Sequence, residues 1–342
     1  MTPDPQQTVV DPFGERSRGQ HKRELQLLGG RFVFRSDSPD LLALVDTAYR
    51  GLPAHRLSQG DTEFEIELRL TEGPSFAGLQ SPPEPRMQGG AGFVCALMDA
   101  FNLAIAYPEA RRGLVAISRE MLRCFPYHAR YELIEFLVFT LASRAQGLVP
   151  LHAGCVGLQG RGALLVGESG AGKSTLSLHC MLHGGLDFLT EDASFVAPQD
   201  LSVRGVGNFL HLRFDSLKFL DDEEMRAIAS ASPVIRRRSG VEKYELDLRQ
   251  PWARLAPAPL KLEHIVMVSS DSAASGPLLM PLGTGDLLAR FTRSQPYAAQ
   301  QPGWSQFVGQ ISSLHGHRLR RGSHPREAAE ALRGLLLSVG AA

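Results

Sequence analysis

Hydrophobic periodicity predicts that the first part of the chain mixes strands with helices. Residues 30–35 form a short apolar run, and residues 64–70 alternate apolar with charged side chains, as in a strand with one buried face. Ser38 and Pro39 open a predicted helix over 41–48. Residues 73–92 hold four prolines and five glycines, which predicts a loop or an inserted flap.

The pattern changes after a long apolar stretch. Residues 131–146 are apolar nearly all round, which predicts a buried helix that bridges two domains. From residue 148 onward, short apolar runs alternate with helical patterns, as in an α/β layer. We therefore predict a disordered tail at 1–24, a smaller α+β domain at 25–146 and an α/β domain at 148–339.

Composition excludes several classes of partner. Lys plus Arg equals Asp plus Glu at 36 each, so no overall charge draws the protein to nucleic acid or to anionic lipid. No apolar run approaches the roughly 18 residues that a membrane helix needs. The four cysteines form no CxxC pair, and the first 20 residues lack the apolar core of a signal peptide. We expect a soluble cytoplasmic protein, with the basic clusters 236–238 and 315–321 as solvated faces.

One segment predicts phosphate binding. Residues 167–174 read GESGAGKS and satisfy the pattern GxxxxGK[ST], with an apolar strand over 163–166 before it and a helix over 173–183 after it. In this arrangement the backbone N–H groups and the helix dipole attract phosphate, the lysine reaches the β- and γ-phosphates, and the hydroxyl binds Mg²⁺. The predicted ATP- and Mg²⁺-binding residues are Gly167, Glu168, Ser169, Gly170, Ala171, Gly172, Lys173, Ser174 and Thr175.

Two carboxylates are predicted to return to this loop. A helix of about eleven residues carries the chain about 16 Å away, and five strand residues over 186–190 bring it about 16 Å back. Glu191 and Asp192 then follow at the end of the strand. One acid is expected to hold Mg²⁺ together with Ser174, and the other to accept a proton from an attacking hydroxyl. An acidic loop facing solvent is the simpler alternative.

A histidine is predicted beside the same loop. A strand over 151–156 and the strand before the loop form a predicted hairpin around Gly160. Cross-strand pairing would then set His152 opposite Gly167 or Glu168. A core histidine with satisfied hydrogen bonds is about equally consistent with the sequence.

Taken together, these features resemble the catalytic domain of HPr kinase/phosphorylase, and more closely the related serine kinases of bacterial biosynthetic clusters. Phosphoenolpyruvate carboxykinase has a similar nucleotide core. The resemblance is sharp over 151–196 and implies a P-loop kinase domain of this type. It places the lysine of the family on Lys173, the metal-binding hydroxyl on Ser174, the active-site histidine on His152 and the acidic pair on Glu191 and Asp192, with Asp192 and Ser174 as metal ligands.

The sequence departs from the family at Glu191, where the bifunctional enzymes have Asp, which puts phosphorolysis in doubt. Residues 204–207 read RGVG and are similar to a signature of the family, but they follow the acids too closely. We interpret them as a flexible turn at the end of a strand.

We predict an ATP-dependent kinase that phosphorylates a serine hydroxyl on a peptide or small protein, as the resemblance implies. Two alternatives stay open: a kinase for free serine or a sugar, and a regulatory module that binds ATP without transfer. The oligomeric state is open, a homo-oligomer included. Phosphoryl transfer needs cations beside the transferred group, and the candidates are Arg213, Lys218, Arg290 and Arg293. For each of them the alternative is an ordinary solvated surface residue.

Overall fold

The computed structural model describes residues 19–55, 62–76, 78–273 and 276–338, and its contacts divide the chain into two compact units. Unit 1 comprises residues up to Leu25, Arg31–Arg50 and Thr62–Leu141. Unit 2 comprises Gln26–Gly30, Gly51–Asp61 and the chain from Ala142 onward. No helix in the described parts is both long enough and apolar enough to cross a bilayer.

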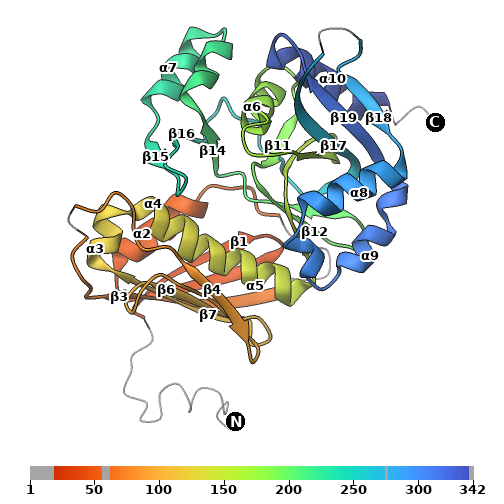
Figure 1. Ribbon diagram of the computed structural model, residues 1–342. Helices are drawn as coiled ribbons and strands as arrows, with labels where there is room; N and C mark the ends of the chain where they lie inside the picture. The colour runs from red at the N-terminus through yellow and green to blue at the C-terminus, as the bar shows by residue number, and fades with distance from the viewer. Residues whose placement is uncertain (1–18, 56–61, 77, 274–275, 339–342) are drawn as a thin grey trace. The chain divides into compact units, whose positions relative to one another are not determined.

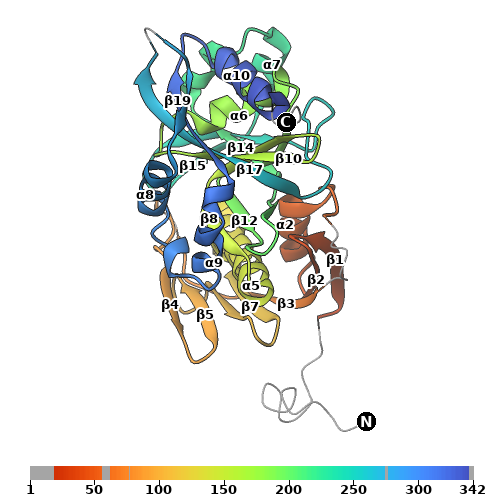
Figure 2. The ribbon, with the colours of Figure 1, turned by 90° about the vertical axis from the view of Figure 1, so that its right-hand side faces the viewer.

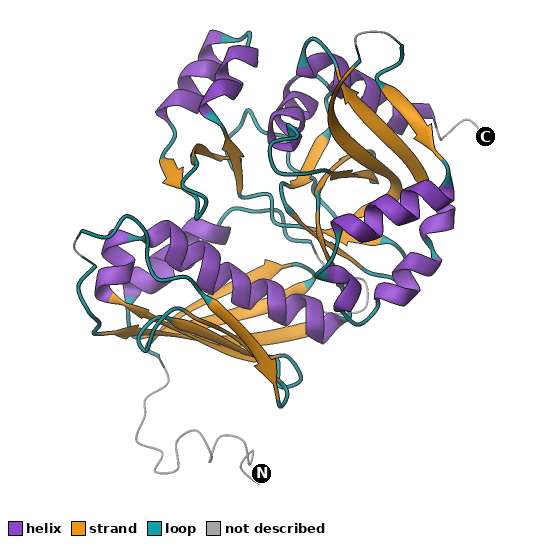
Figure 3. Ribbon diagram, in the orientation of Figure 1, coloured by secondary structure: helices purple, strands orange, loops and turns teal. Residues whose placement is uncertain are grey.

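Unit 1 is built on a seven-stranded sheet with the order β1-β2-β3-β7-β6-β5-β4. On β3 the apolar side chains Phe64, Ile66 and Leu68 are buried, as the alternating pattern predicts. A long helix, π-helical at first, lies across one face of the sheet (Figure 3). The strands are β1 His21–Leu27, β2 Gly30–Ser36, β3 Thr62–Thr71, β4 Arg86–Gly90, β5 Phe93–Leu97, β6 Leu103–Tyr107 and β7 Arg112–Ser118, and the helices are α2 Pro39–Tyr49, α3 Arg119–Cys124, α4 Pro126–His128, η1 Ala129–Glu135 and α5 Phe136–Gln146. Unit 2 includes the end of β1, the first residue of β2 and the last five residues of α5.

Two predictions for this part of the chain are wrong in detail. The tail predicted over 1–24 is too long, because β1 begins at His21; residues 1–18 lie outside the described residues. The segment over 73–92, predicted as a loop or an inserted flap, is not all loop, because it contains β4, whose exposed residues pair with β5 over Arg86–Gly90. A strand with no buried side chain leaves no apolar alternation in the sequence, so the pattern could not reveal it.

Unit 2 is an α/β domain, as predicted, around a mixed nine-stranded sheet. Its strand β10, which precedes the phosphate loop, is parallel to β17 and antiparallel to β9. The strands of the sheet are β8 Val149–His152, β9 Gly154–Leu158, β10 Arg161–Val166, β11 Asp187–Thr190, β12 Ala193–Val196, β13 Ser202–Arg204, β17 Leu260–Ser272, β18 Leu279–Leu282 and β19 His315–Arg321. A separate three-stranded sheet has the order β14-β16-β15, formed by β14 Phe209–Leu212, β15 Val234–Arg236 and β16 Glu242–Asp247.

Helices cover both faces of the nine-stranded sheet. Successive residues of β10 enter different cores: Leu165 packs with the face that carries α6 and α10, and Leu164 with the face that carries α8 and α9. Figure 2 shows these two pairs of helices on opposite sides of the strands, and Figure 1 labels the elements. The helices of unit 2 are α6 Lys173–Leu182, α7 Glu223–Ala231, α8 Thr284–Ser294, α9 Trp304–Gly309 and α10 Pro325–Ser338, with short 3-10 turns η2 Phe214–Phe219, η3 Ala298–Gln300 and η4 Ile311–Ser313.

The hairpin predicted around Gly160 is present, but the strand predicted over 151–156 is broken. At Ala153 the backbone N–H donates to the carbonyls of Leu151 and Asp192, at 3.0 and 3.1 Å. This tight turn diverts the chain, so β8 pairs with β12 while β9 pairs with β10.

Candidate active site

The phosphate loop connects β10 to α6 in the predicted order of strand, loop and helix. Gly170 and Gly172 have φ angles of 86° and 95°, which lie in the left-handed region where glycine alone is unstrained. Gly167 is required for a different reason, since a Cβ atom there would lie 2.6 Å from the carbonyl oxygen of Val268. The loop is therefore shaped by Gly167 and Gly172, which the motif specifies, and by Gly170, which stands at a position that the motif leaves free.

Lys173 begins α6 and turns its side chain back into the loop. Its ammonium donates hydrogen bonds to the carbonyl oxygens of Gly167 at 2.7 Å and Glu168 at 3.3 Å, and the residue is 7% exposed. The other loop residues differ in exposure: Glu168, Ser169, Gly170 and Gly172 are exposed, whereas Ala171 and Ser174 are half-buried. Thr175 forms a hydrogen bond with Ser216 at 2.9 Å and so ties α6 to η2. A buried ammonium and the N-terminus of a helix thus face the same loop.

The acidic pair follows β11 and meets this loop. The hydroxyl of Ser174 donates to Oε1 of Glu191 at 2.5 Å, and Glu191 is buried. Gly154 on β9 makes room for this approach, because a Cβ atom there would lie 2.7 Å from the Glu191 carbonyl oxygen. Asp192 is more open, with 30% of its side chain exposed, and its carboxylate lies 3.6 Å from the guanidinium of Arg237. The two neighbouring acids therefore have different surroundings.

His211, which the sequence does not connect with the acidic pair, holds Glu191 in place. His211 on β14 donates from Nδ1 to Glu191 at 2.6 Å and from Nε2 to Glu245 at 3.2 Å, and its backbone N–H also donates to Glu191. Because both ring nitrogens face carboxylates, only the protonated ring can donate to both. The chain of contacts runs from Ser174 through Glu191 and His211 to Glu245.

The charges along this series of contacts favour an ion pair between Glu191 and His211. Burial by itself raises the pKa of Glu191, but the charge and hydrogen bond of His211, with a further hydrogen bond from Ser174, lower it below the usual range. Burial is the largest single influence and lowers the pKa of His211, but Glu191 and Glu245 together raise it by more, so that the net shift is upward. Both shifts favour the pair of an ionised Glu191 and a protonated His211.

His152 does not lie where the hairpin predicted. The pairing of β9 with β10 ends at Gly154 and Leu165, before His152 is reached, because the turn at Ala153 moves His152 onto β8. There it pairs with Ala193, the residue after the acidic pair, and its backbone N–H and C=O both bond the side-chain amide of Gln295, at 2.8 and 3.0 Å. His152 is exposed. The predicted position opposite Gly167 or Glu168 is therefore wrong, although His152 stays on the strand next to the acids.

The four candidate cations lie in different places. Arg213 is 56% exposed in its side chain, forms an ion pair with Asp215 at 3.5 Å, and comes 4.0 Å from where a Cβ of Gly170 would stand. Lys218 lies over the ring of Phe219. Arg290 and Arg293 are exposed on α8. Of the four, Arg213 is the one with a described approach to the loop.

The RGVG segment is not a flexible turn. A Cβ atom on Gly205 would lie 2.5 Å from Cβ of Thr190, and one on Gly207 would lie 3.2 Å from the carbonyl oxygen of Leu189. Both glycines therefore let the chain pack closely against β11, the strand that carries the acidic pair.

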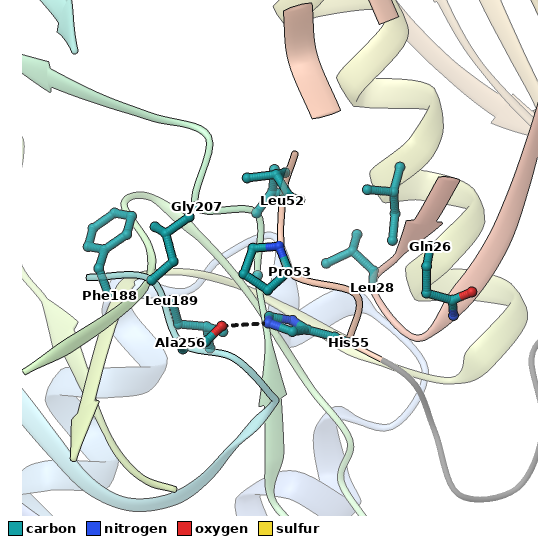
Figure 4. Close-up of a pocket in the computed structure, with 13 residues that line it drawn as sticks. Gln26, Leu28, Leu52, Pro53, His55, Phe188, Leu189, Gly207 and Ala256 are labelled. Carbon is teal, nitrogen blue, oxygen red and sulfur yellow. Dashed lines mark hydrogen bonds between the residues drawn. The ribbon is translucent and has the colours of Figure 1, made fainter. Parts of the chain in front are cut away.

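A mostly apolar pocket lies behind the same strand, as Figure 4 shows. Phe188 and Leu189 of β11 contribute to its wall with Leu28, Leu52 and Ala256, and His55 donates from Nε2 to the carbonyl of Ala256 at 2.9 Å. No residue of the phosphate loop or the acidic pair lines this pocket. We regard it as separate from the candidate site.

No protein family model and no curated protein sequence matches this chain. Among solved structures, the Hpr(Ser) kinase/phosphatase from Coxiella burnetii is similar over 56% of this chain and 89% of that chain, with 13% sequence identity and a TM-score of 0.26. At this identity and TM-score the likeness supports no statement about the fold or function of this chain. The functional conclusion therefore depends on the geometry of the site.

Proposed function

We propose that this chain is an ATP-dependent kinase that transfers the γ-phosphoryl group to a serine hydroxyl of a peptide or small protein. The observation that supports this most strongly is the 2.5 Å hydrogen bond between Ser174 and Glu191. It joins the phosphate-binding loop to a carboxylate, and phosphoryl transfer needs both in one site.

Phosphate binding follows from the loop itself. The N-terminus of α6 supplies backbone N–H groups and the positive end of a helix dipole. Lys173 adds a buried charge that already lies within the loop. When the triphosphate binds, this ammonium exchanges its carbonyl partners for phosphate oxygens, which are stronger acceptors.

The residues present also suit Mg²⁺. Ser174 and Glu191 offer a hydroxyl and an ionised carboxylate side by side, and Mg²⁺ in nucleotide sites needs only one or two protein oxygens beside phosphate and water. We therefore assign Ser174 and Glu191 to the metal, which makes Glu191 rather than Asp192 the metal-side acid. When bound, the ion neutralises charge on the β- and γ-phosphates.

Asp192 is then the acid available to the acceptor, because its carboxylate is partly exposed and does not bond Ser174 in the described contacts. In the transfer step, Asp192 takes the proton of the serine hydroxyl, and the serine oxygen forms a bond to the γ-phosphorus. The bond from that phosphorus to the β,γ-bridging oxygen breaks, and its electron pair leaves with ADP. A positioned base of this kind contributes about 10²- to 10⁴-fold in rate.

The acceptor can be identified by incubating the chain with Mg²⁺, γ-labelled ATP and the peptides and small proteins encoded beside its gene, followed by mass spectrometry. We expect phosphate on a serine, lost in Asp192→Asn and kept in the matched control Asp286→Asn, an exposed acid on α8. Label that appears only on a small molecule would identify the kinase for free serine or a sugar. ATP binding without any transfer would identify the regulatory module.

A further inference from the structure

The three-stranded sheet of unit 2 brings a second set of charged residues to the acidic pair. His211 on β14 is paired with Glu245 on β16, and both lie in the chain of contacts that ends at Glu191. Side chains two residues apart on a strand point to the same face. Lys243 therefore lies on the same face of β16 as Glu245, toward the candidate site.

Arg237 reaches the site from the turn between β15 and β16. The turn is closed by hydrogen bonds from the Arg237 N–H to Val241 and from the Gly240 N–H to Arg237, both at 2.9 Å. Gly240 has a φ of 78°, which such a turn requires. The guanidinium lies 3.6 Å from Asp192, and the Arg237 side chain is only 18% exposed, whereas the neighbouring Arg236 is exposed. Arg237 is thus directed at the acidic pair and Arg236 is not.

Lys243 belongs to the same cluster of charges. It is half-buried, and burial is the largest influence that lowers its pKa. Glu191, Arg237, Asp192 and Lys173 also act on its charge. The cluster contains four cations and three acids. The cations are Lys173, Arg237, Lys243 and His211, and the acids are Glu191, Asp192 and Glu245. A site with an excess of positive charge around two acids is suited to an anion that arrives between them.

We propose that Arg237 and Lys243 bind the terminal phosphoryl group of ATP and stabilise its charge during transfer, an inference that rests on the proposed kinase function. The basic cluster at 236–238 then has two roles: Arg237 acts in the site, and Arg236 stays on the surface. In phosphoryl transfer the negative charge spreads over the equatorial oxygens of the moving group, and fixed cations lower the barrier there. Arg237 contacts Asp192 at 3.6 Å, whereas no described contact joins Lys218, Arg290 or Arg293 to the acidic pair.

The test compares two nucleotides that differ in the group concerned. Binding of AMPPNP and of ADP, each with Mg²⁺, is measured by titration calorimetry for the wild-type chain and for Arg237→Ala, Lys243→Ala and the matched control Arg236→Ala. We expect AMPPNP affinity to fall roughly tenfold in each site variant, which is the loss of one charge-assisted hydrogen bond, while ADP affinity stays within about twofold. Arg236→Ala should match the wild type for both nucleotides.

Single-turnover phosphoryl transfer gives a second readout, with an expected fall on the order of 10²- to 10³-fold in each site variant and partial recovery in Arg237→Lys. Thermal melting of Arg237→Ala and Lys243→Ala checks that these variants are folded. If the wild type prefers AMPPNP and transfers phosphate but the site variants behave like Arg236→Ala, the inference is overturned and the kinase proposal survives. If the wild type binds neither nucleotide, both are overturned.

Discussion

Replacing His211 by Gln tests the electrostatics that hold the acidic pair in place. The change removes the imidazolium charge and one of the two N–H donors that face Glu191 and Glu245. Breaking a buried ion pair by removing one partner costs about 3–5 kcal/mol. Because Glu191 keeps its hydrogen bonds from Ser174 and from the backbone N–H of residue 211, we expect the lower end of that range, about 3 kcal/mol.

The loss should depend on pH in a defined way. Glu191 has a lowered pKa in the folded chain, so its contribution to stability is present above its ordinary value of 4.5 and is lost as the pH falls. His211 has a raised pKa, so its contribution is full below its ordinary value of 6.5 and is lost as the pH rises through the folded value. The difference between wild type and His211→Gln should therefore be largest between about pH 4.5 and 6.5 and smaller at pH 9.

Urea unfolding without nucleotide or Mg²⁺ measures this difference. The chain has two tryptophans, Trp252 and Trp304, and both lie in unit 2, so intrinsic fluorescence follows the unfolding of the unit that contains the site. His21→Gln on the exposed start of β1 is the matched control and should leave the free energy of unfolding unchanged. Equal stability of His211→Gln and wild type at pH 6, or a loss of the same size at pH 6 and pH 9, would refute the reasoning.

Three further changes test the loop and the packing around it. Lys173→Ala removes the buried ammonium and should weaken ATP binding roughly 10- to 100-fold in calorimetry. Gly205→Ala forces a Cβ atom to 2.5 Å from Thr190 and should lower the free energy of unfolding by about 1–3 kcal/mol in urea. Gly334→Ala lies in the exposed interior of α10 with nothing within 4 Å and should raise it by about 0.5–1 kcal/mol.

Each of these three predictions can be contradicted by a specific result. Unchanged ATP affinity in Lys173→Ala would mean that the loop does not bind the phosphates. A Gly205→Ala variant as stable as the wild type would show that β11 is not packed as described. Because Gly334→Ala makes the same chemical change at an open position, a loss of stability there would show that the cost at Gly205 does not come from crowding.

The parts of the site that follow from local sequence could be predicted. The GKS loop contains its own strand and helix signals, and the return of Glu191 depends only on the lengths of one helix and one strand. The signals of the loop and these two lengths are all contained in about 30 consecutive residues. The strand β3 could be predicted for the same reason, because its apolar and charged residues alternate within one short segment.

The remaining residues depend on pairing between distant segments. His211 and Glu245 meet because β14 pairs with β16, and the two residues are 34 positions apart. The sequence of Arg237 and its neighbours has the pattern of a solvated basic cluster, and only the folded turn shows that Arg237 approaches Asp192. The position predicted for His152 is wrong because the chain turns at Ala153. The alternation of side chains along the sequence continues through this turn unchanged, so the sequence does not reveal it.

The most direct test of the central claim is a crystal structure of this chain with Mg²⁺ and AMPPNP. The account predicts the terminal phosphate against Lys173, the metal beside Ser174 and Glu191, and the Asp192 carboxylate open to an acceptor. A nucleotide bound elsewhere, or a phosphate in the loop with Glu191 turned away from the metal, would contradict it.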